Sequence, residues 1–127
     1  MSSSLISKDF VYAVVGASNN KDKFGYKISR DLIEIGLKII PINLKEKSIL
    51  NLKTYTRLSD YPGKIDVVVF IVPPEVTKKV LREVNELEIK KVWMQPGSES
   101  KEAIAYCREK RIQSVRNSCI RLTAKKQ

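Results

Sequence analysis

The sequence predicts an α/β protein in which helices cover both faces of a parallel sheet. Short apolar runs rich in β-branched residues alternate along the chain with segments whose apolar positions recur at helical spacing. The first apolar run ends at a glycine, and a polar loop then leads into a helical pattern. A later run is apolar on both faces, which is typical of a central parallel strand. Strands that alternate with helices in this way form a parallel sheet.

The first strand is expected over residues 9–15 and the first helix over residues 25–35. Gly16, Ala17 and Ser18 end the strand and begin the polar loop. A strand, a glycine turn and a helix form an anion site, because the free N–H groups of the turn and the positive end of the helix point at one place. The order of these residues therefore predicts a pocket for a phosphate-bearing cofactor.

The segment after the first helix combines a second strand with an irregular connection. Residues 38–43 predict the second strand, and Pro41 indicates that this strand is ending or lies at an outer position of the sheet. Residues 45–61 are the least regular part of the chain. They contain a short strand or extended link at residues 54–56 and a helical turn at residues 58–62.

The second half of the chain repeats the order of strand and helix. Pro74 suits the first turn of a helix, where its missing N–H costs nothing, and Ser98 or Ser100 is the expected cap of the next helix. The expected elements are a strand at residues 65–72, a helix from 73 to about 88, a strand at 91–95, a helix to about 110, a strand at 112–116 and a basic tail from about 117.

This order of elements predicts a three-layer, Rossmann-like, doubly wound parallel sheet of about five strands in the order 3-2-1-4-5. The first and fourth strands, which begin near Val11 and Ile65, flank the point where the winding reverses. Ligands of such sheets bind at that point, outside the carboxyl ends of the strands. We therefore expect the pocket between the loop that follows residue 15 and the loop at residues 71–73.

Composition limits the classes of function that fit the chain. Its 127 residues suit a single domain, and they carry a net charge of +10. The basic tail has no interleaved aromatic residues for base stacking, so nucleic acid is a disfavoured partner. The charge instead indicates a solvated lysine-rich surface or an attraction for an anionic small molecule. No signal-peptide pattern or bilayer-length apolar run is found in the sequence, which predicts a cytoplasmic protein.

The content of histidine and cysteine disfavours catalysis. The sequence has no histidine, which excludes a Ser-His-Asp triad and a Cys-His pair. Two cysteines cannot build a disulfide framework or a zinc site alone, so we expect no metal site. Cys107, within a helix, is expected to be structural. Whether any reaction is catalysed stays open, and a binding module is favoured over an enzyme.

The residues at the glycine turn disfavour common nucleotides as ligands. Ser18 and Lys21 occupy the second and third glycine positions of the dinucleotide fingerprint, and no acidic residue ends the second strand, so NAD is disfavoured. NADP is less strongly disfavoured than NAD, because Lys45 or Lys47 could face the additional phosphate of NADP. ATP lacks a Walker A loop. The residues alone leave open an NADP-type binder or small reductase, and a basic protein that binds nucleic acid.

Six short motifs occur in register over about residues 9–121, nearly the whole chain. They are Val15-Gly16-Ala17-Ser18, Lys23-Phe24-Gly25-Tyr26, Ile40-Pro41-Ile42-Asn43, Asp66-Val67-Val68 with Pro73-Pro74-Glu75, Val92-Trp93-Met94-Gln95-Pro96-Gly97 and Asn117-Ser118-Cys119-Ile120. Together they resemble the family of stand-alone CoA-binding domains, whose domain is similar to the nucleotide-binding half of the succinyl-CoA synthetase alpha subunit. Phe24 and Leu44 stand where the family often has proline.

The resemblance implies that the chain binds coenzyme A or an acyl-CoA as a binding or regulatory module. The synthetase has a second, ligase-type domain and an active-site histidine, and these 127 residues contain neither, so ligase chemistry is not implied. A homodimer and a separate partner subunit both stay open. We expect residues 1–127 to form one CoA-binding domain.

The cofactor-binding residues are assigned as follows. Gly16 lets the backbone approach a phosphate, the N–H groups of Ala17 and Ser18 bind pyrophosphate, and Lys23 supplies charge. Tyr26 packs either on the ligand or in the core. Pro41 and Asn43 form the far wall, and Lys45 reaches a phosphate. An apolar wall for the pantetheine arm is assigned to Ile71, Val72 and Pro73. Gln95 and Gly97 lie at the pocket mouth.

Cys119 lies just beyond the last predicted strand, near the same rim of the sheet. Two interpretations compete. The cysteine forms a mixed disulfide with the CoA thiol, or it packs as a small hydrophobic residue, which is the favoured interpretation.

Overall fold

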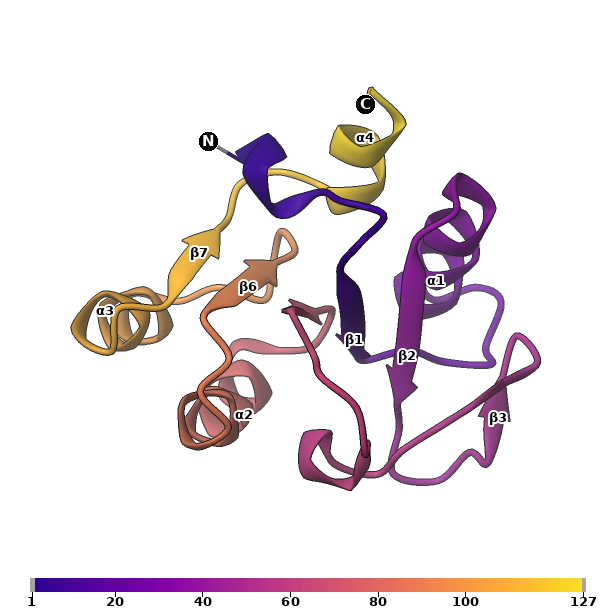
Figure 1. Ribbon diagram of the computed structural model, residues 1–127, viewed down its shortest axis with the longest axis horizontal. Coiled ribbons are helices and arrows are strands. Elements are labelled where there is room, and N and C mark those ends of the chain that lie inside the picture. Colours follow the sequence, from indigo (N-terminus) through magenta and orange to yellow (C-terminus); the bar gives the residue numbers. More distant parts are fainter. Residues whose placement is uncertain (1, 127) are drawn as a thin grey trace.

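The computed structural model describes residues 2–126, except for the side chains of Ser2 and Ser3. Its centre is a five-stranded parallel sheet in the order β2-β1-β5-β6-β7 (Figure 1). The strands are β1 (Val11–Val15), β2 (Lys38–Ile42), β5 (Val67–Phe70), β6 (Lys91–Met94) and β7 (Gln113–Val115). Val15 lies opposite both Ile42 of β2 and Phe70 of β5. The winding therefore reverses between β1 and β5, as the sequence predicts.

Helices cover both faces of this sheet. The helical elements are the 3₁₀ helices η1 (Ser2–Leu5) and η2 (Leu58–Asp60) and the α-helices α1 (Phe24–Ile35), α2 (Pro74–Glu86), α3 (Lys101–Glu109) and α4 (Ile120–Lys125). Tyr12 and Val14 of β1 pack in a core cluster with α1, α4 and η1. Ala13 and Val15 pack in a second cluster with α2, α3 and η2. This three-layer, doubly wound arrangement confirms the predicted fold class.

The strands are shorter than the apolar runs that predict them. The longest run, residues 65–72, contributes only Val67–Phe70 to the sheet. Before this strand, the Asp66 side chain accepts a hydrogen bond from the N–H of Val11. After it, the N–H of Ile71 donates to the carbonyl of Val15. Residues at both ends of the run therefore connect β1 and β5 without extending β5.

The irregular segment after β2 covers the outer edge of that strand. Residues 54–56, expected as a short strand or extended link, contribute only an isolated bridge between Tyr55 and Ile42. The N–H of Tyr55 donates to the carbonyl of Pro41, and β2 is an outer strand, as Pro41 indicates. A small hairpin of β3 (Ser48–Ile49) and β4 (Leu52–Lys53) was not expected. Its two turn residues both have positive φ, which is typical of a type I′ turn.

The segment after about residue 117, predicted as a basic tail, contains helix α4. Ile120 and Ala124, four positions apart, lie on one side of α4 and are buried in the core. Figure 1 shows α4 beside η1, so the two ends of the chain lie together at one end of the molecule. A helix of six residues is too short for its periodicity to stand out in the sequence.

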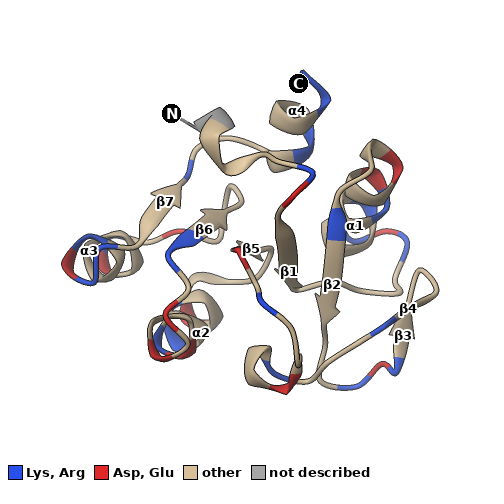
Figure 2. Cartoon of the chain, viewed as in Figure 1, with Lys and Arg blue, Asp and Glu red and all other residues tan. Residues whose placement is uncertain are grey.

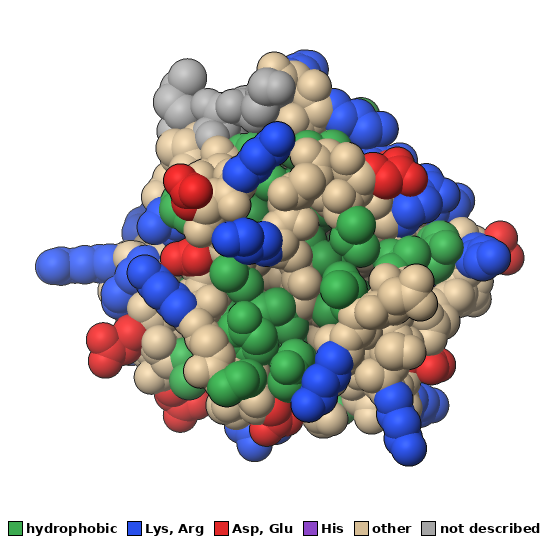
Figure 3. Space-filling model, turned by 45° about the vertical axis from the view of Figure 1, so that its right-hand side comes forward, with side chains coloured by type: hydrophobic (Ala, Val, Ile, Leu, Met, Phe, Trp, Pro, Cys, Tyr) green, Lys and Arg blue, Asp and Glu red, His purple; other side chains and the backbone are tan. Residues whose placement is uncertain are grey.

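Charged side chains are spread over the whole surface. Figure 2 shows Lys and Arg on most elements, mixed with Asp and Glu, while the charged residues of α4, Arg121 and Lys125, are both basic. On the face seen in Figure 3, apolar side chains gather near the middle and basic side chains lie around them. No helix within residues 2–126 is long and apolar enough to cross a membrane.

An ion-pair cluster fixes α4 against α1. The Asp31 carboxylate, whose side chain is 8% exposed, lies 3.0 Å from Arg121 Nη1, 3.1 Å from Arg30 Nη2 and 3.8 Å from Lys125 Nζ. Burial opposes ionisation of Asp31, but the hydrogen bonds from Arg30 and Arg121 and the neighbouring positive charges outweigh it. The pKa of Asp31 is therefore held below its ordinary value of 3.8.

The variant Asp31→Asn is expected to lower the free energy of unfolding at pH 7 by about 1–3 kcal/mol, because it removes the buried negative charge that pairs with Arg30, Arg121 and Lys125. A lowered folded-state pKa contributes stability that is complete above the ordinary value and is lost as the pH falls through the folded value. The difference between wild type and variant should thus be constant above about pH 5 and shrink at lower pH. Urea denaturation at a series of pH values measures this difference.

The control is Asp9→Asn, because Asp9 is exposed and its replacement should change stability by no more than about 0.5 kcal/mol. An Asp31→Asn variant as stable as wild type at pH 7 contradicts the assignment. So does a difference that persists unchanged to pH 2.

Candidate functional site

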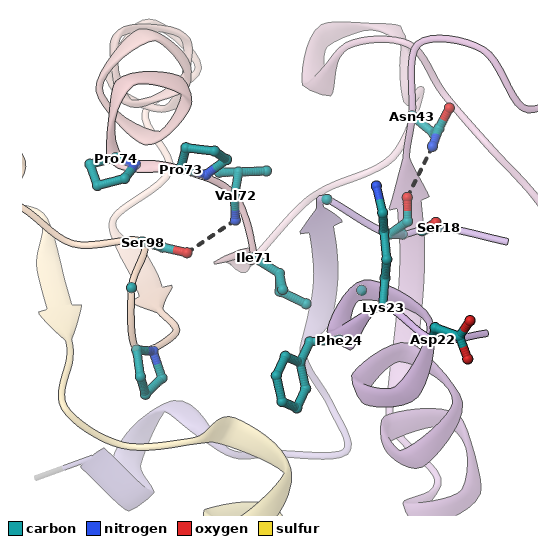
Figure 4. Close-up of a pocket in the computed structure, with 15 residues that line it drawn as sticks. Ser18, Asp22, Lys23, Phe24, Asn43, Ile71, Val72, Pro73, Pro74 and Ser98 are labelled. Atoms are coloured by element: carbon teal, nitrogen blue, oxygen red, sulfur yellow. Dashed lines mark hydrogen bonds between the residues drawn. The ribbon is translucent and has the colours of Figure 1, made fainter. Parts of the chain in front are cut away.

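A cleft of about 820 Å³ opens where β1 and β5 end. Its walls come from the loop after β1, the start of α1, the loop from β5 to α2, and the turn after β6 (Figure 4). Most of the predicted site residues line it: Gly16, Ala17, Ser18, Lys23, Asn43, Ile71, Val72, Pro73 and Gly97. The structure therefore brings together segments that are up to about eighty residues apart in the sequence, at the point where the sheet reverses.

The turn after β1 is in very close contact with two other segments. Gly16 has φ +104°, and a Cβ atom there would overlap the carbonyl oxygen of Ile71 and lie 2.9 Å from Val72 Cγ1. A Cβ atom on Gly25, in the first turn of α1, would overlap the carbonyl oxygen of Gly16. Both residues must therefore be glycine for β1, α1 and the end of β5 to meet as closely as they do.

This close contact leaves main-chain donors at the cleft. Among residues 2–126, no hydrogen-bond acceptor is found for the N–H groups of Ala17, Ser18, Phe24 or Gly25. The last two belong to the first turn of α1, where the helix dipole is positive. Figure 4 shows the amino group of Lys23 inside the cleft, while Asp22 points away from it. This arrangement suits an anion.

Two polar side chains hold the walls in place. Asn43 donates from Nδ2 to the carbonyl of Ala17 at 3.0 Å, and its Oδ1 accepts from the N–H groups of Lys45 and Glu46. On the opposite wall, the Ser98 hydroxyl accepts from the N–H of Val72 at 3.0 Å. Asn43 lines the cleft as predicted, but its hydrogen-bonding groups are already used by the loops that it connects.

Four predicted site residues do not line the cleft. Tyr26 is half-buried on α1, and Lys45 is exposed beyond β2. Pro41 is buried within β2, opposite Val14. Gln95 is 4% exposed, and its Oε1 accepts from the N–H of Ile120 at 2.6 Å. Gln95 therefore holds the start of α4, which is a structural role.

Six residues of the cleft were not predicted as site residues: Asp22, Phe24, Gly25, Pro74, Pro96 and Ser98. Gly25 could have been identified from the sequence. The third glycine of the dinucleotide fingerprint lets a helix pack closely against its strand, and Gly25 plays this part farther along the chain from Gly16 than the fingerprint places it. Phe24, Pro74 and Pro96 stand in the six motifs, but nothing in their chemistry marks them as site residues. Only the fold brings their loops, and those of Asp22 and Ser98, to the cleft.

A smaller cavity of about 270 Å³ adjoins the cleft and includes Cys119. Cys119 is half-buried, and its Sγ accepts a hydrogen bond from Gln95 Nε2 at 3.3 Å. Whether Cys119 forms a mixed disulfide stays a prediction. Cys107 is fully buried on α3, and burial raises its pKa to about 11, which suits the structural role expected of it.

Comparison with known proteins identifies relatives of the chain. A family model described as a CoA binding domain matches residues 11–125. The alpha subunit of the ADP-forming acetate–CoA ligase II of Pyrococcus furiosus is 36% identical over 81 residues, which are 63% of this chain and 18% of that protein. The chain thus spans less than a fifth of the length of this ligase subunit.

Two other relatives are close to this chain in length. The uncharacterized protein YneT of Bacillus subtilis is 29% identical over 110 residues, which cover 87% of this chain and 82% of YneT. The solved structure of a conserved hypothetical protein from Pyrococcus furiosus has a TM-score of 0.86 and 36% identity, and the match covers 89% of this chain and 97% of that one.

The variant Gly25→Ala should lower the free energy of unfolding by about 3 kcal/mol, because its methyl group would overlap the main chain of Gly16. Without that contact, alanine in a helix would stabilise the protein, so the sign of the effect tests the contact. Thermal and urea denaturation measure it.

The control is Gly97→Ala, because Gly97 has φ +96° and no heavy atom within 4 Å of a Cβ position. The Gly97→Ala variant should lower the free energy of unfolding by only about 1–2 kcal/mol, which is the cost of placing alanine at a positive φ. A Gly25→Ala protein more stable than the Gly97→Ala protein would overturn the close contact.

Proposed function

We propose that the cleft of this chain, which belongs to the CoA-binding domain family, holds coenzyme A or an acyl-CoA across the ends of β1 and β5. The family match confirms the resemblance indicated by the six motifs, and coenzyme A as the cofactor. The observation that carries the location is the set of unpaired N–H groups at Ala17, Ser18 and the start of α1, which belong to residues that line an open cleft.

The pyrophosphate lies at the turn after β1 in this proposal. The missing side chain of Gly16 lets the end of β5 lie against this turn, and the main-chain donors of Ala17 and Ser18 are left for a phosphate. The positive end of α1 and the ammonium group of Lys23 add attraction for the negative charge. These groups require no histidine, which the chain lacks.

The pantetheine arm runs from there along the wall formed by Ile71, Val72 and Pro73, toward Gly97. These residues lie on the two loops that follow β5 and β6. The wall offers apolar contact, and the hydrogen bond from the N–H of Val72 to Ser98 keeps it in place. A flexible arm with few charges suits a surface of this kind.

The adenosine end lies on the other side of the pyrophosphate, toward the end of β2. Asn43 forms the wall there, and the exposed Lys45 follows it directly. Lys45 does not line the cleft in the structure, but its long side chain carries a charge to a 3′-phosphate that projects beyond the cleft.

We propose that the chain acts as a binding or regulatory module. The Pyrococcus furiosus relative is an acetate–CoA ligase subunit of which this chain matches a small part, and the proposal takes over only the step in which coenzyme A is bound. The alternatives are an NADP-type binder and a protein that binds nucleic acid, and a panel of ligands distinguishes all three.

Isothermal titration with coenzyme A, dephospho-CoA, NADP and an oligonucleotide tests the function. Coenzyme A should bind most tightly. In thermal denaturation, coenzyme A at one hundred times its Kd should raise the free energy of unfolding by about 2.7 kcal/mol. Tighter binding of NADP or of the oligonucleotide than of coenzyme A contradicts the proposal.

Two lysine variants test the orientation of the ligand. Lys23→Ala should weaken coenzyme A and dephospho-CoA alike, by about three- to tenfold, because both contain the pyrophosphate. Lys45→Ala should weaken coenzyme A by a similar factor and leave dephospho-CoA unchanged, because only coenzyme A has the 3′-phosphate.

Lys21→Ala is the matched control, because Lys21 is exposed in the same loop as Lys23 and does not line the cleft. If all three variants weaken both ligands equally, the lysines contribute only general charge, and the assigned orientation is wrong.

A further inference from the structure

The smaller cavity and the cleft share part of their walls. Phe24, Ile71 and Pro96 line both of them. Figure 4 shows the side chain of Ile71 pointing toward Phe24 at the lower end of the cleft. The smaller cavity is thus a side chamber at the end of the cleft formed by the loops after β5 and β6, where the proposed path of the pantetheine arm ends.

The side chamber offers mainly apolar surface to a guest. Ile28 and Ile71 form part of its inner wall, and Phe24 and Leu122 are 61% and 56% exposed beside it. Large exposed apolar side chains around a cavity are surface that an apolar ligand would cover. The polar Gln95 in the lining has both side-chain groups occupied, by Ile120 and by Cys119.

The charged residue of the lining is held by another contact. Arg121 lines the chamber, and its Nη1 is paired with Asp31 at 3.0 Å. Its Nε is buried and closed to solvent, so it offers no donor to a ligand in the chamber.

We propose that the side chamber is the subsite for the acyl group of an acyl-CoA thioester. The acyl chain is apolar, which matches the apolar walls of the chamber. The free thiol of coenzyme A leaves these walls uncovered. The volume of about 270 Å³ has room for a chain of up to about eight carbons. This inference rests on the proposed function, because it requires the pantetheine arm to run along the β5 loop.

Isothermal titration of the full chain with coenzyme A, acetyl-CoA, butyryl-CoA and octanoyl-CoA tests the subsite. Each buried methylene should raise the affinity about fourfold, reduced by the cost of ordering the chain. Butyryl-CoA should therefore bind about tenfold more tightly than coenzyme A, and octanoyl-CoA should bind at least as tightly as butyryl-CoA.

The variant Leu122→Ala removes one wall of the chamber from an exposed position of α4, where alanine favours the helix. It should reduce the advantage of butyryl-CoA over coenzyme A at least threefold and leave coenzyme A binding unchanged. The matched control is Leu44→Ala, because Leu44 is 80% exposed and lines neither the cleft nor the chamber.

Cys119 gives a second measurement that needs no variant. Cys119 is half-buried and lines the chamber, so saturating butyryl-CoA should slow its alkylation by iodoacetamide more than acetyl-CoA does. Both ligands have blocked thiols and do not consume the reagent.

Equal affinity for coenzyme A and butyryl-CoA, or alkylation of Cys119 unaffected by saturating butyryl-CoA, overturns the acyl subsite and leaves the proposed function standing. Failure of every CoA compound to bind overturns the proposed function itself.

Discussion

The contact of three backbone segments at Gly16 is the constraint on which the rest of the structure depends. The carbonyl oxygen of Ile71 and the first turn of α1 both occupy space that side chains on Gly16 and Gly25 would fill. This contact directs the positive end of α1 at the turn after β1 and leaves the main-chain donors there without partners. It also places Phe24, the first residue of α1, between the cleft and its side chamber.

The sequence was sufficient to predict the sheet and the position of the cleft. Apolar runs rich in β-branched residues and the helical spacing between them mark elements that are buried for their whole length, such as β5. The same patterns identify which loops meet at the reversal of the sheet. They do not show which side chains in those loops are already paired. Gln95 was assigned to the pocket mouth because it is a polar residue directly after an apolar strand. In the structure its side-chain oxygen accepts a hydrogen bond from the N–H of Ile120.

Helix α4 shows why a run of charge is ambiguous in a sequence. Arg121 and Lys125 gave the end of the chain the composition of a solvated tail, although both lie beside Asp31, about ninety residues earlier in the chain. A partner at that distance leaves no local signal. The two apolar residues of α4 that enter the core are too few to outweigh the charge in any window of sequence. The side chamber was missed for the same reason, because it exists only once α4 lies against α1.

The two edge strands of the sheet, β2 and β7, affect how copies of the protein can contact each other. On one border, Pro41 lacks an N–H and Tyr55 already bridges the strand. On the other, β7 has only three residues. Neither border of the described sheet presents the long row of free amide and carbonyl groups on which a foreign strand builds. Strand addition is thereby hindered at both borders of the sheet, which leaves helices and loops as the larger surfaces for contact between copies.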